Sequence, residues 1–194
     1  MINTNNNEIL NLAIKNNNIE VVKLLLENNN LDINYQDTCG YTALMIACEK
    51  NDIEIVKLLL TNKDININLQ DINGNSALMI ATCSSIDIIQ LLLKYKNINV
   101  NLQNKHGDHA LILACTCNTK IVKLLLKNKN INVNLQNNEK KSALDYANED
   151  IKKLLEEYKQ NNDFELINKN LLTINITKEM IDNKEFTLNF IIKE

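Results

Sequence analysis

The sequence contains no proline, no tryptophan and no arginine, and it has three glycines among 194 residues. The scarcity of proline and glycine excludes a flexible linker and a collagen-like chain. Aromatic residues make up 4% of the chain, although the hydrophobic fraction is an ordinary 45%. Leucine, isoleucine and alanine must therefore fill the core, which suits small stacked helices better than one large globule.

The missing features also disfavour several classes of function. The net charge is −3, no basic face stands out, and without arginine no side chain forms a bidentate pair with guanine. No apolar run approaches the ~20 residues of a membrane span. Residues 1–5 have neither the basic flank nor the apolar core of a signal peptide. We therefore expect a cytoplasmic monomer that binds neither nucleic acid nor membrane, with its five cysteines as free thiols.

Three short phrases return at a fixed interval along most of the chain. One opens with alanines at positions 43, 77, 110 and 143, which are 34, 33 and 33 residues apart. A Lys/Gln-Leu-Leu-Leu phrase keeps the same step, and so does an Asn-x-Gln-Asp/Asn phrase that begins at positions 34, 68, 101 and 134. In-register repetition of three phrases predicts stacked supersecondary units that present a surface.

Residues 41–73 illustrate one unit. Thr42 precedes a helical pattern and can cap it, Asn51-Asp52 interrupts the pattern, and a second helix follows. The apolar faces expected on the two helices comprise Leu44, Ala47 and Cys48, then Ile53, Val56, Leu59 and Leu60. Alternating Ile65, Ile67 and Leu69 then predict an extended arm. Glycines at positions 40, 74 and 107 recur at one phase, as a turn with positive φ requires.

This order of elements resembles the ankyrin repeat, whose signature runs roughly G-x-T-P-L-H-x-A-A. Gly40-x-Thr42-Ala43-Leu44-Met45-x-Ala47-Cys48 follows that signature, and Asp32-Ile33-Asn34 follows the D-V-N element of the arm. The resemblance covers about residues 7–157 and implies an all-α ankyrin-repeat solenoid with extended hairpin arms. We expect a repeat domain over 1–158, with units at about 7–39, 40–73, 74–106, 107–139 and 140–158, followed by a tail at 159–194.

Departures from the signature lead to further expectations. The signature proline is alanine in every copy, and the signature histidine is replaced by Met45, Met79, Ile112 and Asp145. The hydrogen bonds that this histidine usually makes between repeats are expected to be missing, so apolar packing must carry more of the stability. The fifth unit has Lys140 in the glycine position and is expected to end near Tyr158.

Asparagine is in large excess, at 37 of 194 residues. Its runs at 5–7, 16–18 and 28–30 lie between apolar segments. Because asparagine tolerates positive φ and bonds its own backbone, we interpret these residues as loop filler rather than as an aggregation-prone tract.

The sequence provides little support for catalysis or metal binding. No nucleophile elbow, phosphate loop, dinucleotide loop or Cys-His arrangement occurs. Cys115 and Cys117 lie near His106 and His109, but structural zinc sites use C-x2–4-C spacing. We predict packed or rim thiols, with no metal, no cofactor and no enzymatic activity. His109 replaces a capping threonine, so the neighbouring Asp108 is expected to cap that helix.

The resemblance implies a non-catalytic protein-binding module. In ankyrin proteins the partner lies across the concave surface, against arm tips and the exposed ends of first helices. At those places the residues differ between copies, and Tyr41 and Ile72 are the best expected anchors. The predicted binding residues are Thr38, Cys39, Tyr41, Glu49, Lys50, Ile72, Asn73, Asn75, Cys83, Ser84, Lys105, His106, Asp108, Thr116, Cys117, Asn138, Glu139 and Lys141. The alternative for each is an ordinary exposed loop residue.

The tail leaves the repeat pattern and admits several interpretations. Gln160-Asn161-Asn162-Asp163 looks like a boundary, after which alternation at 172–177 and 186–192 predicts two short strands, with a helix around Met180. The tail is either a cap on repeat five or a motif that recruits a second protein. The first makes the protein a structural or sequestering binder, and the second makes it an adaptor. An enzyme remains only as a subunit completed by another chain.

Overall fold

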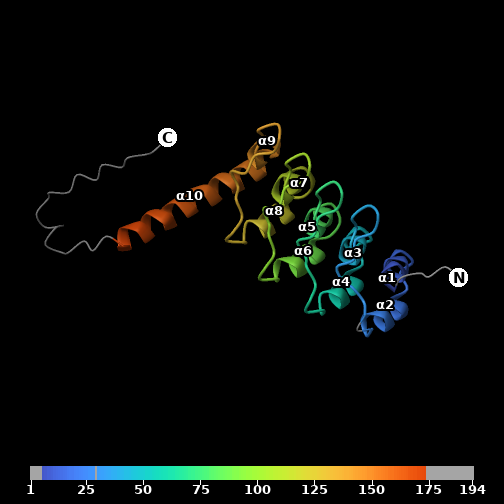
Figure 1. Cartoon of the computed structure of the whole chain (residues 1–194). Coiled ribbons are helices and arrows are strands. Elements are labelled where there is room, and N and C mark those ends of the chain that lie inside the picture. The colour runs from blue at the N-terminus through green and yellow to red at the C-terminus, as the bar shows by residue number, and fades with distance from the viewer. Residues whose placement is uncertain (1–5, 29, 174–194) are drawn as a thin grey trace, which may run out of the picture. The chain divides into compact units, whose positions relative to one another are not determined.

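The computed structural model describes residues 6–28 and 30–173, the last eleven of them (163–173) by backbone alone. Helices occur in consecutive pairs, and no strand forms within these residues (Figure 1). The sequence prediction of an all-α solenoid built from helix pairs is confirmed. The contacts divide the chain into Met1–Leu155, which holds the stacked pairs, and Glu156–Glu194.

The first and second helices of the pairs form two rows within Met1–Leu155 (Figure 1). The first row holds α1 (Asn6–Lys15), α3 (Ala43–Glu49), α5 (Ala77–Ala81), α7 (Ala110–Cys117) and α9 (Ala143–Tyr146). The second holds α2 (Ile19–Leu26), α4 (Ile53–Leu59), α6 (Ile86–Leu93) and α8 (Thr119–Leu125), and α10 (Glu149–Thr173) follows α9. Each helix packs against its neighbour in the row, and most first helices also pack against their own second helix.

The helices start where side-chain oxygens or nitrogens accept otherwise unpaired backbone N–H groups. Thr42 accepts from the Met45 N–H at 3.2 Å, which confirms the expected cap of α3. His109 caps α7 in the same way, because its Nδ1 accepts from the Ile112 N–H at 3.2 Å. The expectation that Asp108 would cap this helix is therefore wrong: the imidazole replaces the threonine oxygen directly.

The core lies between the two rows and between successive pairs. Leu59 is fully buried there, as its place on the expected inner face requires. Helix α3 is buried more completely than predicted, since every residue from Ala43 to Cys48 is buried. The reason is that α3 packs against α1, α4 and α5 at once, so it has no solvent-facing stripe in its interior turns.

The arms after the second helices consist of turns separated by irregular segments, and no helix forms in them, as the alternation of isoleucines predicted. Within the second arm, Asn62 Oδ1 accepts from the Asp64 N–H at 2.9 Å and Asn66 Oδ1 accepts from the Asn68 N–H at 3.0 Å. Such Asx turns compete successfully with strand pairing. Ile67 is buried beneath the turns, and it anchors the arm to the core.

The C-terminal helix α10 differs from expectation. It runs without a break from Glu149 to Thr173, so residues 160–163 do not interrupt the regular structure and the final helix does not end near Tyr158. Leu172 and Thr173, expected in a strand, are helical. The remainder of that strand, the strand at 186–192 and the helix around Met180 lie outside the described residues. No helix in the described part of the chain combines the length and apolarity needed to cross a bilayer.

Candidate protein-interaction face

Four turns project from the junctions between arms and first helices, and they share one construction. We call residues 37–41, 71–75, 104–108 and 137–141 the tips. Asp71 Oδ1 accepts from the Asn73 N–H at 2.8 Å and from the Asn75 N–H at 2.7 Å. The same pair of bonds is made in the other tips by Asp37, Asn104 and Asn137. The first residue of each tip therefore fixes the loop, and its neighbours can vary.

Glycine is required in the tips for two reasons. Gly40, Gly74 and Gly107 have φ of +76°, +80° and +77°, which confirms the predicted left-handed turns. The following tip also passes close by, because a Cβ on Gly74 would lie 2.8 Å from the Cα of Asn104. The fourth tip has Lys140 at φ +60°, where the chain continues into α9 and α10 rather than toward another tip.

Backbone hydrogen bonds join each tip to the next. The Ile72 N–H donates to the Cys39 carbonyl at 3.1 Å, and the Lys105 N–H donates to the Asn73 carbonyl at 2.8 Å. The Asn138 N–H continues the series to the His106 carbonyl at 3.0 Å. Predicted binding residues from four tips are thereby held in one row, at a separation that main-chain geometry sets.

A second set of hydrogen bonds joins the arms, and side-chain amides make it. Asn68 Nδ2 donates to the Asn97 carbonyl at 2.7 Å, while its Oδ1 accepts from the Asn99 N–H at 2.8 Å. Asn34 and Asn101 form the same two bonds to the next arm. These bonds come from the asparagine of the D-V-N element and not from the signature histidine position, so hydrogen bonds join the repeats in addition to apolar packing.

A hollow of about 410 Å³ opens beside the tips of repeats two and three. Five of the predicted residues line it together: Tyr41, Glu49, Asn75, Cys83 and Ser84. Its apolar wall comes from Met79, Ile80 and Leu113, which the sequence interpretation did not select. Ile80 and Leu113 occupy the same position in the first helices of their repeats, so an alignment of the repeats could have selected both.

Charge and burial at this hollow act on Tyr41. Burial is the largest cause that raises the pKa of its phenol, and the negative charges of Glu49 and Asp71 raise it further. The ring is partly buried, and its hydroxyl stays protonated at neutral pH. The hollow thus offers an aromatic face, a neutral hydroxyl and a carboxylate to a partner.

Other predicted residues lie outside the hollow. Ile72 is 54% exposed at the second tip, and Thr38, Asn73, Lys105 and His106 are exposed on their tips. Lys50 lines a different hollow, beside the turn between α1 and α2. Asp108 is committed to the framework, because its carboxylate accepts from Asn137 Nδ2 at 2.8 Å.

The last tip carries an exposed ion pair. Lys141 Nζ lies 2.7 Å from Glu139 Oε2 and 5.8 Å from the centre of the Tyr146 ring. Exposed pairs of this kind contribute little to stability. Both side chains remain accessible on the face that the tips form.

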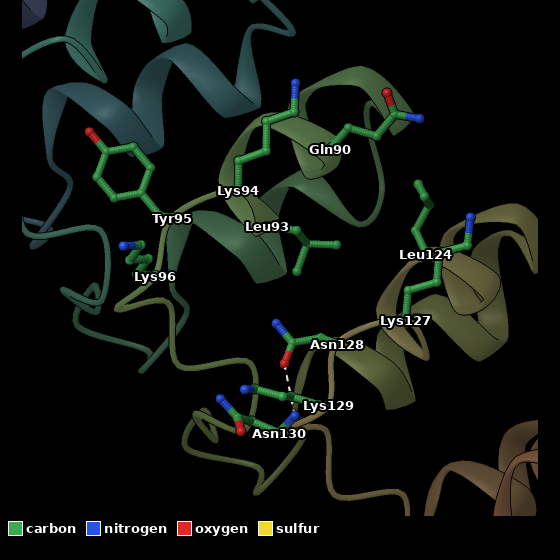
Figure 2. A pocket seen from close by; sticks show the side chains of 10 residues that line it. All are labelled: Gln90, Leu93, Lys94, Tyr95, Lys96, Leu124, Lys127, Asn128, Lys129 and Asn130. Carbon is green, nitrogen blue, oxygen red and sulfur yellow. Dashed lines mark hydrogen bonds between the residues drawn. The ribbon is translucent and has the colours of Figure 1, made fainter. Parts of the chain in front are cut away.

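The structure gathers lysines into a groove that the sequence did not reveal. The groove has a volume of about 920 Å³ and lies between the arms of repeats three and four, where Figure 2 shows the side chains around it. Lys94, Lys96, Lys127 and Lys129 line it, and its lining contains no carboxylate. The expectation that no basic face stands out is wrong at this place, because lysines from two repeats meet only after stacking.

The cysteines fall into two environments. Cys48 and Cys115 are buried, and burial raises the pKa of each thiol to about 12. Cys39, Cys83 and Cys117 are exposed free thiols. Among the described residues, no group of three or more histidine, cysteine or acidic side chains is placed to hold a metal ion.

Comparisons with known proteins agree with the geometry. A family model of ankyrin repeats in three copies matches residues 10–104, and a model of the single ankyrin repeat matches residues 106–138. A comparison with curated proteins found no match. Repeats of this kind are in general protein–protein interaction modules and are typically not enzymes.

Proposed function

Because the chain belongs to the ankyrin repeat family, we propose that it is a non-catalytic module that binds a partner protein across the tips and the hollow at Tyr41. The partner covers on the order of 800 Å² of this face, as a standard interface does. The proposal includes a monomer in the cytoplasm that uses no cofactor and binds no nucleic acid.

One observation carries the proposal: the hollow combines an apolar wall with the polar side chains of Tyr41 and Glu49 at its edge. Met79, Ile80 and Leu113 form the wall, and Tyr41 and Glu49 stand at its edge. An apolar pocket with a few polar groups suits the central anchor side chain of a partner. By contrast, the Asp and Asn residues that start the tips are consumed by internal hydrogen bonds.

A capture experiment tests this face. The double variant Tyr41→Ala with Ile72→Ala should keep its helical circular dichroism and lose partner capture by about 30-fold or more, as removal of hot-spot anchors does. The matched control is Leu24→Ala, since Leu24 is a 68% exposed hydrophobic residue on α2, away from the tips. Equal capture by the double variant and the control would contradict the proposed face.

Two uses of such a module remain, and the tail distinguishes them. An adaptor holds its target on the repeats and a second protein on the tail, whereas a sequestering binder uses the tail as a cap. Deletion of residues 163–194 leaves target capture intact in both cases. Loss of a second captured protein supports the adaptor. A lower urea midpoint with an unchanged set of captured proteins supports the cap.

A further inference from the structure

Two exposed thiols from neighbouring repeats meet beside the hollow. Cys83 directly follows the C-terminal cap of α5, and Cys117 is the last residue of α7. They are 34 residues apart in the sequence, yet their sulfur atoms lie 3.5 Å apart. Since α5 and α7 pack side by side in the first row, the stacking of repeats three and four creates this pair.

The repeat pattern alone does not produce this pair of cysteines, because the two residues occupy different positions within their repeats. Cys83 lies six residues after the alanine that opens its phrase, whereas Cys117 lies seven residues after Ala110. At the phase of Cys83, the other repeats have Glu49 and Thr116. The dithiol is therefore a feature of this surface and not of the common scaffold.

We infer that Cys83 and Cys117 are a redox-active dithiol, which forms a reversible disulfide when it meets a small disulfide oxidant such as oxidised glutathione. The sulfurs need to approach by roughly 1.5 Å to reach the ~2.0 Å bond length. Both side chains are exposed, so the proposed approach of the sulfurs is by side-chain rotation at the surface.

The reaction balances through ordinary thiol–disulfide exchange. One cysteine thiolate attacks the oxidised glutathione, whose S–S bond breaks, and one glutathione thiolate leaves. The second cysteine thiolate attacks the mixed disulfide and releases the second glutathione thiolate. The two protein thiols lose two protons and two electrons, and the oxidised glutathione takes them up to become two molecules of reduced glutathione.

The other cysteines are unsuited to compete. Cys48 and Cys115 are buried with pKa values of about 12, so they present almost no thiolate at neutral pH. Cys115 and Cys117 are two residues apart on one helix, and their side chains point to different sides of it. Burial, then the hydrogen bond with Cys117, raises the pKa of the Cys83 thiol, so disulfide formation accelerates as the pH rises above neutrality.

The position gives the disulfide a consequence. Cys83 lines the hollow beside Tyr41 and Glu49, so the bond ties repeat three to repeat four at the wall of that hollow. We expect oxidation to alter partner capture, and this consequence rests on the function proposed above. Formation of the disulfide does not depend on it.

Peptide mapping of the full chain tests the inference. The protein is incubated at pH 8 with oxidised glutathione, alkylated in denaturant, and digested with trypsin without reduction. The expected product links residues 64–94, which hold Cys83, to residues 106–120, which hold Cys117, with the alkyl group on Cys115. The linked peptide should disappear in Cys83→Ser and Cys117→Ser, persist in the matched exposed-cysteine control Cys39→Ser, and be lost on dithiothreitol treatment.

The outcomes separate the two proposals. Glutathione that remains attached to Cys83 or Cys117, or a digest without the linked peptide, overturns the dithiol. A linked peptide whose formation leaves partner capture unchanged supports the dithiol and counts against the hollow as the binding site. Formation of the linked peptide together with a change in partner capture supports both the dithiol and the hollow, provided that the oxidant does not change capture by Cys117→Ser.

Discussion

Removal of one amide that crosses between repeats provides a direct test of how this stack is held together. Asn68→Ala deletes the side chain whose Nδ2 and Oδ1 bridge to the carbonyl of Asn97 and the N–H of Asn99. Its own N–H still donates to Asn66 Oδ1, so the turn of the second arm stays intact. The variant thus removes two bonds between repeats and leaves the local structure in place.

The expected cost follows from the number of bonds and their exposure. A typical intramolecular hydrogen bond contributes about 0.5–1.5 kcal/mol, so two bonds give about 1–3 kcal/mol. Both bonds lie at the surface, where water replaces the lost partners. We therefore expect about 1–2 kcal/mol, which lowers the urea midpoint by roughly 0.5–1 M for an m-value of about 2 kcal/mol/M.

The chain contains a matched control. Asn134 occupies the same position of the same phrase, and its N–H donates to Asn132 Oδ1 as the N–H of Asn68 does to Asn66. Within the described residues no further arm follows the fourth one, and no hydrogen bond joins the Asn134 side chain to another repeat. Asn134→Ala should change the free energy of unfolding by less than about 0.5 kcal/mol.

Equilibrium urea unfolding, followed by circular dichroism, measures both variants. The same substitution in the same phrase has the same effect on the unfolded chain, so the difference between the two isolates the bridge. Equal free energies of unfolding for Asn68→Ala and Asn134→Ala would refute the reasoning. In that case apolar packing alone would hold the arms in register.

Three further predictions use the same unfolding assay. Burial holds the pKa of His109 below its ordinary 6.5; its stabilisation is therefore complete above about pH 6.5 and is lost as the pH falls through the folded pKa. His109→Thr, which restores the cap type of Thr42, should flatten the pH dependence of stability below about pH 6.5, and an unchanged slope would contradict the role of the imidazole. Lys140→Gly should raise stability by about 0.5–1 kcal/mol, since the relief of a left-handed φ exceeds the added chain entropy, and a loss of stability would count against strain at the fourth tip. Leu59→Ala should cost about 2–5 kcal/mol, whereas exposed Leu24→Ala should cost less than about 0.5 kcal/mol, and a neutral Leu59→Ala would place the inner face elsewhere.

The features that sequence reasoning predicted correctly depend on local chemistry repeated at a fixed step. Gly74 needed positive φ, Thr42 had the oxygen for a cap, and Leu59 followed helical spacing, and each behaves as expected. A wrong prediction arose where a side chain can serve in more than one structural role. His109 looked like a lost cap, but its Nδ1 accepts the bond that threonine would accept. The alternating isoleucines predicted an extended arm without indicating which turns shape it, and Asx turns do so.

By itself, the sequence determined the period, the helix pairs, the glycine tips and the burial of the leucines, because short local patterns predict each feature and these patterns recur at a fixed interval. Only the tertiary structure decided which groups from different repeats meet. Asn68 forms hydrogen bonds with residues 29 and 31 positions away in the sequence. Four lysines from two arms line one groove. Cys83 and Cys117 approached to 3.5 Å. The physical reason is the same for all three: stacking sets the distance and rotation between repeats, and no single repeat contains that information.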